Sequence, residues 1–462
     1  MKRILNYVII FTITVITLFF ALVVSSMIPH SAIEGKLKES IEFYKKKSGI
    51  YKIKNKKLYS YIHYYADTRK LNIIYCLDSS NPIESTLWAK YYQEIERDTN
   101  RDFINLVEKS KEPNTQYLRY WNGCMLFLRP LLTLFNMEQI YLINQILLAI
   151  LSLILFIMLL KKSKKLAFIF LSALILVSTW YATMCIECSV TFYILFIATM
   201  IAIKIDNNKN NNTKEEVNEK LSKLFLITGI VTTFFDFLTT ELLTIFVPLL
   251  IILIIRKEEN RLDSFKNVTK FVLKVTILWF IGYAGMWLAK WVLASLILQI
   301  NAFEYVKDNF TLRFNGLQGL NNYEELYNHV IERNFFAIPL VDFISANLSK
   351  WEIKFALGSA IVFPLLFTNW KVLKNKKYLL IFIIIGIIPY IRYLILANHS
   401  FRHAMFTFRD QIITIMVLLY IIIECLNYKL LCKKITKDSF KQNDKNNNER
   451  LIESGETKWF QL

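Results

Sequence analysis

The chain has 462 residues, of which 54% are hydrophobic and 20% are charged, and its formal net charge is +19. Its mean hydropathy of +0.35 excludes an ordinary soluble domain, because a soluble fold cannot solvate that much apolar surface. The lysines lie mainly in short connectors between apolar runs, a placement that indicates membrane orientation and argues against nucleic-acid binding.

The apolar runs are about as long as a membrane-spanning helix, which needs about 20 residues. The sequence therefore predicts an all-α polytopic membrane protein with about ten transmembrane helices. The first run, within 1–26, is too long for a typical signal-peptide core, so we expect an uncleaved span. The ten runs lie near 4–26, 138–160, 166–181, 188–204, 222–239, 241–255, 271–289, 354–370, 377–396 and 411–428.

Charge orients these spans. With the N-terminus inside, every connector predicted to face the cytoplasm is rich in Lys or Arg, as the positive-inside rule requires. This predicts a plasma (inner) membrane protein with both termini in the cytoplasm. The basic connectors are 161–165, 204–223, 256–274, 371–377 and the tail from 429.

Two long segments, 27–137 and 290–353, are predicted to face outside. Spans 2–7 then occupy 138–289, spans 8–10 occupy 354–428, and 429–462 is a polar, disordered tail.

Each outer segment has a notable apolar stretch. Residues 119–135 are apolar but carry two arginines, which predicts an interfacial or re-entrant helix in the first segment. At the start of the second segment, 287–297 is expected to lie along the membrane surface, with Lys290 extending outward.

The sequence contains no Walker A loop, HExxH or GxSxG motif. Nucleotide-driven transport and soluble-type hydrolysis therefore have no positive support. Cys185 and Cys188 form a C-x-x-C pair, which we interpret as packing residues because no redox pattern surrounds them.

Asp236 is predicted near the outer end of the fifth span. A carboxylate inside an apolar run costs about 2.5–3.5 kcal/mol at the helix centre and less near the ends. Asp236 is therefore either a functional acid or a polar residue in a turn that Thr239 and Thr240 support.

The loop 397–410 is predicted outside, yet it keeps two arginines against the charge bias. It contains His399, Arg402, His403 and Arg409. The arginines could contact lipid headgroups, or their planar forks could bind a phosphate or diphosphate. The histidines could move a proton, or, as a weaker alternative, bind a metal.

Glycosyl transfer needs a base for the acceptor hydroxyl and groups that stabilise the departing phosphate. Acids of the first outer segment are candidates for the base. They are Glu34, Asp67, Asp78, Glu84, Asp98 and Asp102.

Three short motifs, spread over most of the chain, carry a resemblance. They are Arg119-Tyr-Trp-Asn-Gly123 with Arg129-Pro-Leu-Leu132, Phe235-Asp-Phe-Leu-Thr239, and Asn398-His-Ser-Phe-Arg-His403 with Phe408-Arg409. With a first span followed by a large outer loop, they resemble the GT-C superfamily of polytopic glycosyltransferases. More narrowly, they resemble an uncharacterised bacterial group tied to cell-envelope polysaccharide.

The resemblance implies inverting transfer of a sugar from a polyprenyl-phosphate donor to an envelope glycan or lipid on the outer face. It implies that Asp236 and either Asp78 or Glu84 handle the acceptor or a divalent cation. It also implies that donor phosphate is bound by Arg119, Arg129, His399, Arg402, His403 and Arg409.

The chain departs from the family pattern at two places. Asn122 stands where the family often has His, and the paired-acid motif is matched only loosely by Asp78 through Glu84. These departures leave the identity of the catalytic base open. An O-antigen-polymerase-type enzyme and a lipid-linked-saccharide transporter or flippase are the alternatives. The transferase interpretation expects Asp78, Glu84, Asp236 and Arg402 to line one outward cavity.

Overall fold

The computed structural model describes residues 2–47, 50–52, 61–94, 98–207, 213–236, 238–317, 319–335 and 376–425. Within these ranges the chain is mostly helical, with two small antiparallel sheets of two strands each. The predicted class, an all-α membrane protein, is confirmed at this level.

Six of the described helical stretches are long and apolar enough to cross a membrane. They are Arg3–Ser26 within α1 (Lys2–Ser26), α7 (Met137–Lys162), α9 (Ile186–Asn207), α12 (Phe265–Leu298), α18 (Tyr378–Ile395), and Ala404–Cys425, which joins α20 (Ala404–Thr407), η4 (Phe408–Asp410) and α21 (Gln411–Cys425). Three further predicted spans form helices that are shorter or carry more charge: α8 (Lys164–Leu176), α10 (Lys214–Phe235) and α11 (Leu243–Glu258). The predicted span at 354–370 and the tail at 429–462 lie outside the described residues.

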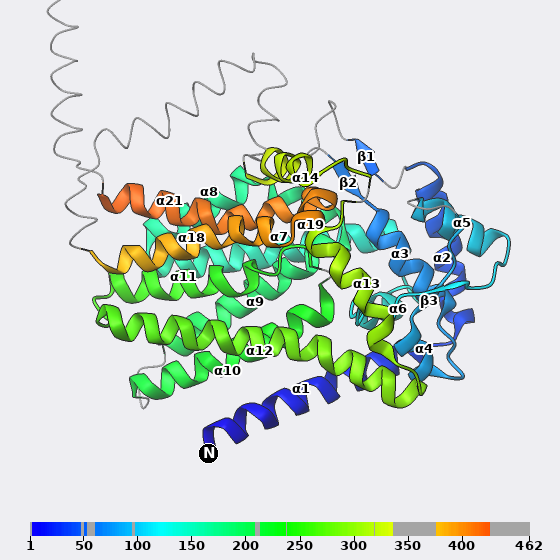
Figure 1. Ribbon diagram of the computed structural model, residues 1–462, viewed down its shortest axis with the longest axis horizontal. Coiled ribbons are helices and arrows are strands. Elements are labelled where there is room, and N and C mark those ends of the chain that lie inside the picture. Colours follow the sequence, from blue (N-terminus) through cyan, green and yellow to red (C-terminus); the bar gives the residue numbers. More distant parts are fainter. Residues whose placement is uncertain are drawn as a thin grey trace, which may run out of the picture.

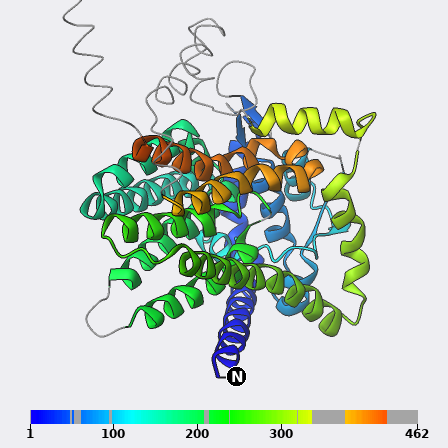
Figure 2. The same cartoon turned by 60° about the vertical axis from the view of Figure 1, so that its left-hand side comes forward.

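The long helices run side by side as a bundle (Figures 1 and 2). The segment predicted to face outside, here called the first outer segment, gathers at one end of the bundle. That segment contains α2 (His30–Lys45), β1 (Ile50–Lys52), β2 (Tyr61–His63), α3 (Tyr65–Cys76), α4 (Pro82–Trp88), β3 (Lys90–Tyr91), α5 (Thr99–Glu108), β4 (Thr115–Gln116) and α6 (Met125–Leu131). The remaining elements are η2 (Thr179–Met184), α13 (Ala302–Asn315), α14 (Tyr323–Val330), η3 (Ile331–Phe335) and α19 (Ala397–Arg402). The N-terminus of α1 lies at the opposite end.

The end of the bundle away from α2–α6 is tied together by ion pairs. Glu424 near the end of α21 lies 2.6 Å from Lys165, 2.7 Å from Lys257 and 2.8 Å from Lys376. These three lysines belong to different basic connectors in the sequence. One carboxylate therefore connects the lysine-rich ends of α8, α11 and α18.

Lys290 is buried and does not extend outward as predicted. It has no exposed surface, and its Nζ donates to the carbonyl oxygens of Thr86 (3.2 Å) and Leu87 (3.0 Å). The prediction was wrong because α12 continues to Leu298 and packs against α4, whose last carbonyls accept from the ammonium group.

The 119–135 stretch contains a short helix, α6, which packs on α1. Ser25 Oγ donates to the carbonyl of Met125 at 2.9 Å, and the Gly123 amide donates to the carbonyl of Phe234 at 3.0 Å. Trp121 Nε1 donates to the carbonyl of Met286 at 2.7 Å. The Trp-Asn-Gly motif therefore anchors the outer segment to α10 and α12.

We expect Gly123→Ala to destabilise the folded protein by about 1–3 kcal/mol, the usual cost of overpacking. A Cβ atom at Gly123 would overlap the carbonyl oxygen and ring of Phe234. Thermal unfolding of the purified protein in detergent measures the effect. Gly35→Ala is the matched control, because a Cβ atom there meets nothing within 4 Å. Equal stability of the two variants would contradict this packing argument.

Candidate functional site

A cavity of about 220 Å³ lies where the first outer segment meets the bundle. Part of its wall comes from the first outer segment, namely α3 and residues near β3 and β4. The rest comes from the start of α9, the connector between α10 and α11, α13, and the α19–α20 segment. Figure 1 shows α3, α13 and α19 near one another at this end of the bundle. Parts of the chain that are far apart in sequence therefore build one site.

Four arginines line this space, which we call the arginine cavity: Arg69, Arg119, Arg313 and Arg402. Glu187 supplies the carboxylate among the lining residues, and it forms a buried ion pair with Lys70. With that acid neutralised, the cavity is strongly positive. Such a site favours an anion with several oxygens, such as phosphate.

Aromatic rings fix two of these arginines. The guanidinium carbon of Arg69 lies 4.0 Å from the ring centre of Tyr91, and that of Arg119 lies 4.1 Å from the ring centre of Tyr117. Gln93 Oε1 also accepts from the Tyr91 hydroxyl at 3.1 Å. Stacking engages the flat face of a guanidinium and leaves its N–H edge for bidentate contact with phosphate.

Two histidines line the wall formed by α13 and α19. His399 Nε2 lies 2.6 Å from the carbonyl oxygen of Leu238, which assigns the proton to Nε2, and Nδ1 has no hydrogen-bond partner among the described residues. Burial and His403, whose ring centre is 4.6 Å away, hold the pKa of His399 well below its usual value. Arg313 Nη1 lies 3.1 Å from His403 Nε2. His399 is therefore neutral, and its Nδ1 can accept a hydrogen bond at this wall.

Asp236 lies directly behind the cavity. It follows the last residue of α10, is 1% exposed, and accepts hydrogen bonds from the backbone amide (2.9 Å) and the hydroxyl of Thr239. Thr239 lines the cavity and Asp236 does not, so Asp236 contacts the cavity through its hydrogen bonds to Thr239.

The same connector rests on a buried ionic cluster. Arg392 of α18 donates to Glu241 Oε1 at 2.8 Å and to the carbonyl of Leu238 at 2.8 Å, and its Nε lies 3.9 Å from Asp410. Neither carboxylate oxygen of Asp410 has a hydrogen-bond partner among the described residues. Leu238 adopts φ of +67°, a conformation unusual for leucine, and its carbonyl accepts from both Arg392 and His399. The cluster thus holds the backbone carbonyl of Leu238 in place beside His399.

Asp78 and Glu84 lie elsewhere. They line a separate cavity of about 490 Å³ beside α3, α4 and α5. Asp78 accepts from the hydroxyl and amide of Ser80, and these bonds lower the pKa of Asp78. The expected convergence of Asp78, Glu84, Asp236 and Arg402 on one cavity is not found.

Arg129 and Arg409 are buried outside the arginine cavity. Arg129 has no exposed surface and donates to the carbonyls of Ile28 (2.6 Å) and Ile74 (2.6 Å); burial lowers its pKa to about 10. Arg409 is 4% exposed and donates to the carbonyl of Met405 at 2.8 Å. Arg129 therefore joins the turn between α1 and α2 to α3. Of the six residues expected at the phosphate, the arginine cavity brings together Arg119, His399, Arg402 and His403.

The other acids of the first segment have structural partners. Asp67 caps the start of α9, accepting from the amides of Ile186 (2.8 Å) and Glu187 (3.0 Å). Glu34 pairs with Lys38, Asp98 accepts from the amide of Arg101, and Asp102 accepts from the amide of Glu94.

The sequence did not single out Arg69, Arg313 or Glu187. Each lies outside the three motifs, and nothing local separates Arg69 or Arg313 from the many other cations of the outer segments. Only their shared cavity identifies them.

Cys185 and Cys188 are buried and unbridged, in agreement with their interpretation as packing residues. Over the described ranges, no three His, Cys, Asp or Glu side chains gather as a metal site would require.

Comparison with known proteins assigns this chain to no family. No protein-family model matches the chain, and no curated protein or solved structure shows significant similarity to it. The site's function must therefore be argued from its residues.

Proposed function

We propose that this chain is a membrane glycosyltransferase that moves a sugar from a polyprenyl-phosphate donor to a cell-envelope glycan or lipid on the extracytoplasmic face. The convergence of four arginines on one small cavity carries the proposal. The proposal includes a GT-C-like architecture, in which α8, α10, α11 and the 354–370 segment are further spans. It places both termini in the cytoplasm, where the lysines around Glu424 fit the positive-inside rule.

A second feature supports a lipid-linked ligand. An apolar groove of about 480 Å³ runs between α6, α7, α9 and α10. Ile186 lines this groove and the next residue, Glu187, lines the arginine cavity. Phe235 lines the groove close to Thr239 of the cavity. The proposal places the phosphate of the lipid in the arginine cavity and its apolar chain in this neighbouring groove.

The proposed reaction breaks the bond between sugar C1 and the phosphate oxygen and forms a bond from C1 to the acceptor oxygen. The phosphate keeps the electron pair, and the arginines stabilise the charge that develops on it. The acceptor proton must pass to a base. Because Asp78 and Glu84 face another cavity, we assign this role to His399 Nδ1, with Asp236 orienting Thr239. The negative charge of a phosphate bound among the arginines would raise the pKa of His399 and make it a stronger base.

The groove makes a testable prediction. We expect Ile197→Trp, which fills the groove, to weaken binding of polyprenyl phosphate by roughly tenfold, since each buried CH₂ contributes about 0.8 kcal/mol. Binding of inorganic phosphate to the same variant should not change. Titration of the purified full-length chain measures both ligands.

Ile154→Trp on α7 is the matched control: Ile154 is 42% exposed, Ile197 is 44% exposed, and only Ile197 lines the groove. If Ile197→Trp leaves the affinity for polyprenyl phosphate at the control value, the groove does not hold the chain.

A lipid-linked-saccharide transporter is the second candidate, favoured by the buried cluster of Arg392, Glu241 and Asp410. Ionisable groups inside a membrane bundle often mark ion or proton pathways. Reconstituted vesicles with a labelled lipid-linked sugar separate the two functions. A transporter changes which leaflet holds the label, whereas a transferase moves the label to the acceptor.

A further inference from the structure

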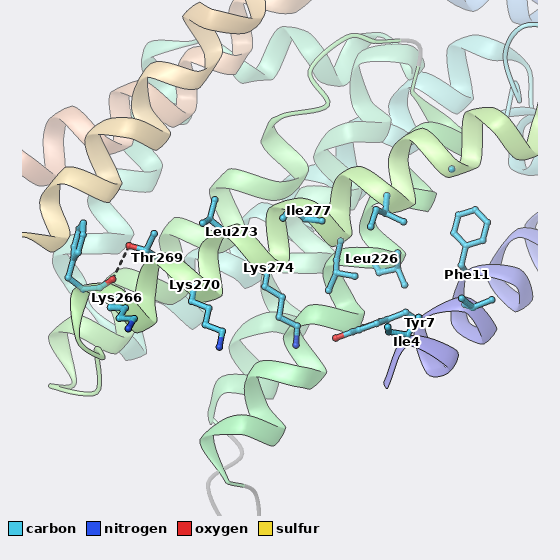
Figure 3. A pocket seen from close by; sticks show the side chains of 15 residues that line it. Ile4, Tyr7, Phe11, Leu226, Lys266, Thr269, Lys270, Leu273, Lys274 and Ile277 are labelled. Carbon is cyan, nitrogen blue, oxygen red and sulfur yellow. Dashed lines mark hydrogen bonds between the residues drawn. The ribbon is translucent and has the colours of Figure 1, made fainter. Parts of the chain in front are cut away.

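Another cavity lies at the other end of the bundle from the arginine cavity. It has a volume of about 1180 Å³ and lies between α1, α10 and the first part of α12 (Figure 3). Ligand sites for drug-sized molecules usually span roughly 300–1,000 Å³, so this cavity suits a larger guest. Its apolar walls include Ile4, Phe11, Leu226 and Ile277.

The cavity is open toward the surface of the bundle that lipid would cover. Ile4 at the start of α1 is 70% exposed, and Leu273 and Ile277 on α12 are each 56% exposed. Side chains this apolar and this accessible need a hydrocarbon neighbour rather than water. The guest is therefore expected to present hydrocarbon to these walls.

Three lysines stand at one edge of this cavity. Lys266, Lys270 and Lys274 follow one another at intervals of four residues on α12, and their side chains extend to the same side of the helix (Figure 3). Lys274 pairs with Glu219 of α10 at 2.7 Å. Lys266 and Lys270 are exposed, and neither pairs with an acid among the described residues. Two uncompensated positive charges thus adjoin an apolar cavity.

We propose that this cavity binds an acidic glycerophospholipid of the surrounding bilayer. The acyl chains lie along the apolar walls, and the phosphate lies beside Lys266 and Lys270. Lysines at a membrane surface attract anionic headgroups, and their long stems let the charge reach the interface while the helix stays in hydrocarbon. A neutral lipid or a second helix would satisfy the apolar walls but would bring no negative charge to the two lysines.

This inference is independent of the proposed function, because it concerns other residues at the other end of the bundle. A bound lipid would join the first turns of α1 to α10 and α12, and ligand binding to the folded state raises stability. The arginine cavity recognises oxygens through fixed, stacked guanidinium planes. The lysines here are point charges, suited to a headgroup with no fixed orientation.

Native mass spectrometry of the full-length chain in nanodiscs tests this, with phosphatidylglycerol and phosphatidylcholine as probes. We expect phosphatidylglycerol to be retained preferentially. The double substitution Lys266→Gln/Lys270→Gln should lower its affinity by about 30-fold, since each such lysine contributes about fivefold, and should remove the preference. The matched control is Lys161→Gln/Lys164→Gln, two exposed lysines that do not line this cavity and whose loss should leave the preference intact.

A cavity-filling variant tests the acyl-chain site separately. Ile277→Trp should lower retention of both lipids, because it occupies the space between α12 and α1. Equal retention of the two lipids by the unsubstituted protein would overturn the proposal in favour of a neutral guest. Loss of a dimer in Ile277→Trp, with lipid retention unchanged, would instead identify a second copy of the chain as the occupant.

Discussion

Replacing Arg402 with alanine is expected to lower sugar transfer by roughly ten- to a hundredfold while leaving the protein in the membrane. Arg402 lines the arginine cavity with Arg69, Arg119 and Arg313. A hydrogen bond to a charged group contributes about 1.5–3 kcal/mol, which sets this range. Arg402→Lys should recover only part of the activity, because lysine keeps the charge but lacks the planar fork. Transfer from a polyprenyl-phosphate sugar by the purified protein measures the effect.

Arg101→Ala is the control for Arg402→Ala, since Arg101 is exposed on α5 and does not line the cavity. Normal glycan chemistry in cells that carry Arg402→Ala would refute the proposed role of Arg402. The glycan product also separates two enzyme classes. Loss of a polymerase leaves single repeat units, whereas loss of a transferase leaves a missing branch sugar.

Replacing Arg392 with methionine should destabilise the fold by about 3–5 kcal/mol, the usual result of removing one partner from a buried ion pair. The change leaves Glu241 and Asp410 as neighbouring buried acids without their cation. It also removes the donor that holds the Leu238 carbonyl. We expect a large loss of folded protein after detergent extraction, measured by thermal unfolding and by size-exclusion chromatography.

The double variant Arg392→Met/Glu241→Gln provides the matched test. If the uncompensated charge of Glu241 causes the destabilisation, neutralising it should recover part of the lost stability. A double variant that is no more stable than Arg392→Met would show that the backbone contact to Leu238, rather than the ion pair, dominates.

Local patterns in the sequence determined the helices and their charge distribution. Apolar length predicted α1, α7, α9, α12, α18 and α21, because hydrocarbon requires a continuous run of residues whose backbone is satisfied within the helix. The same reasoning also predicted spans where the apolar helix is short, as in α8, or begins with a charged half, as in α10, and for these two helices the span stays a prediction. Clusters of unusual polar residues also indicated that the 397–410 loop and the connector after Asp236 are candidate functional segments.

Only the tertiary structure decided which polar groups meet. Arg119 and Arg129 are ten residues apart in the sequence. Arg119 lines the arginine cavity, whereas Arg129 donates hydrogen bonds to the carbonyls of Ile28 and Ile74. Arg69 and Arg313 lie on α3 and α13, and packing brings them together. Helical periodicity describes neighbours within one turn or two. It carries no information on which distant backbone group or cavity a long side chain will reach once the helices have packed.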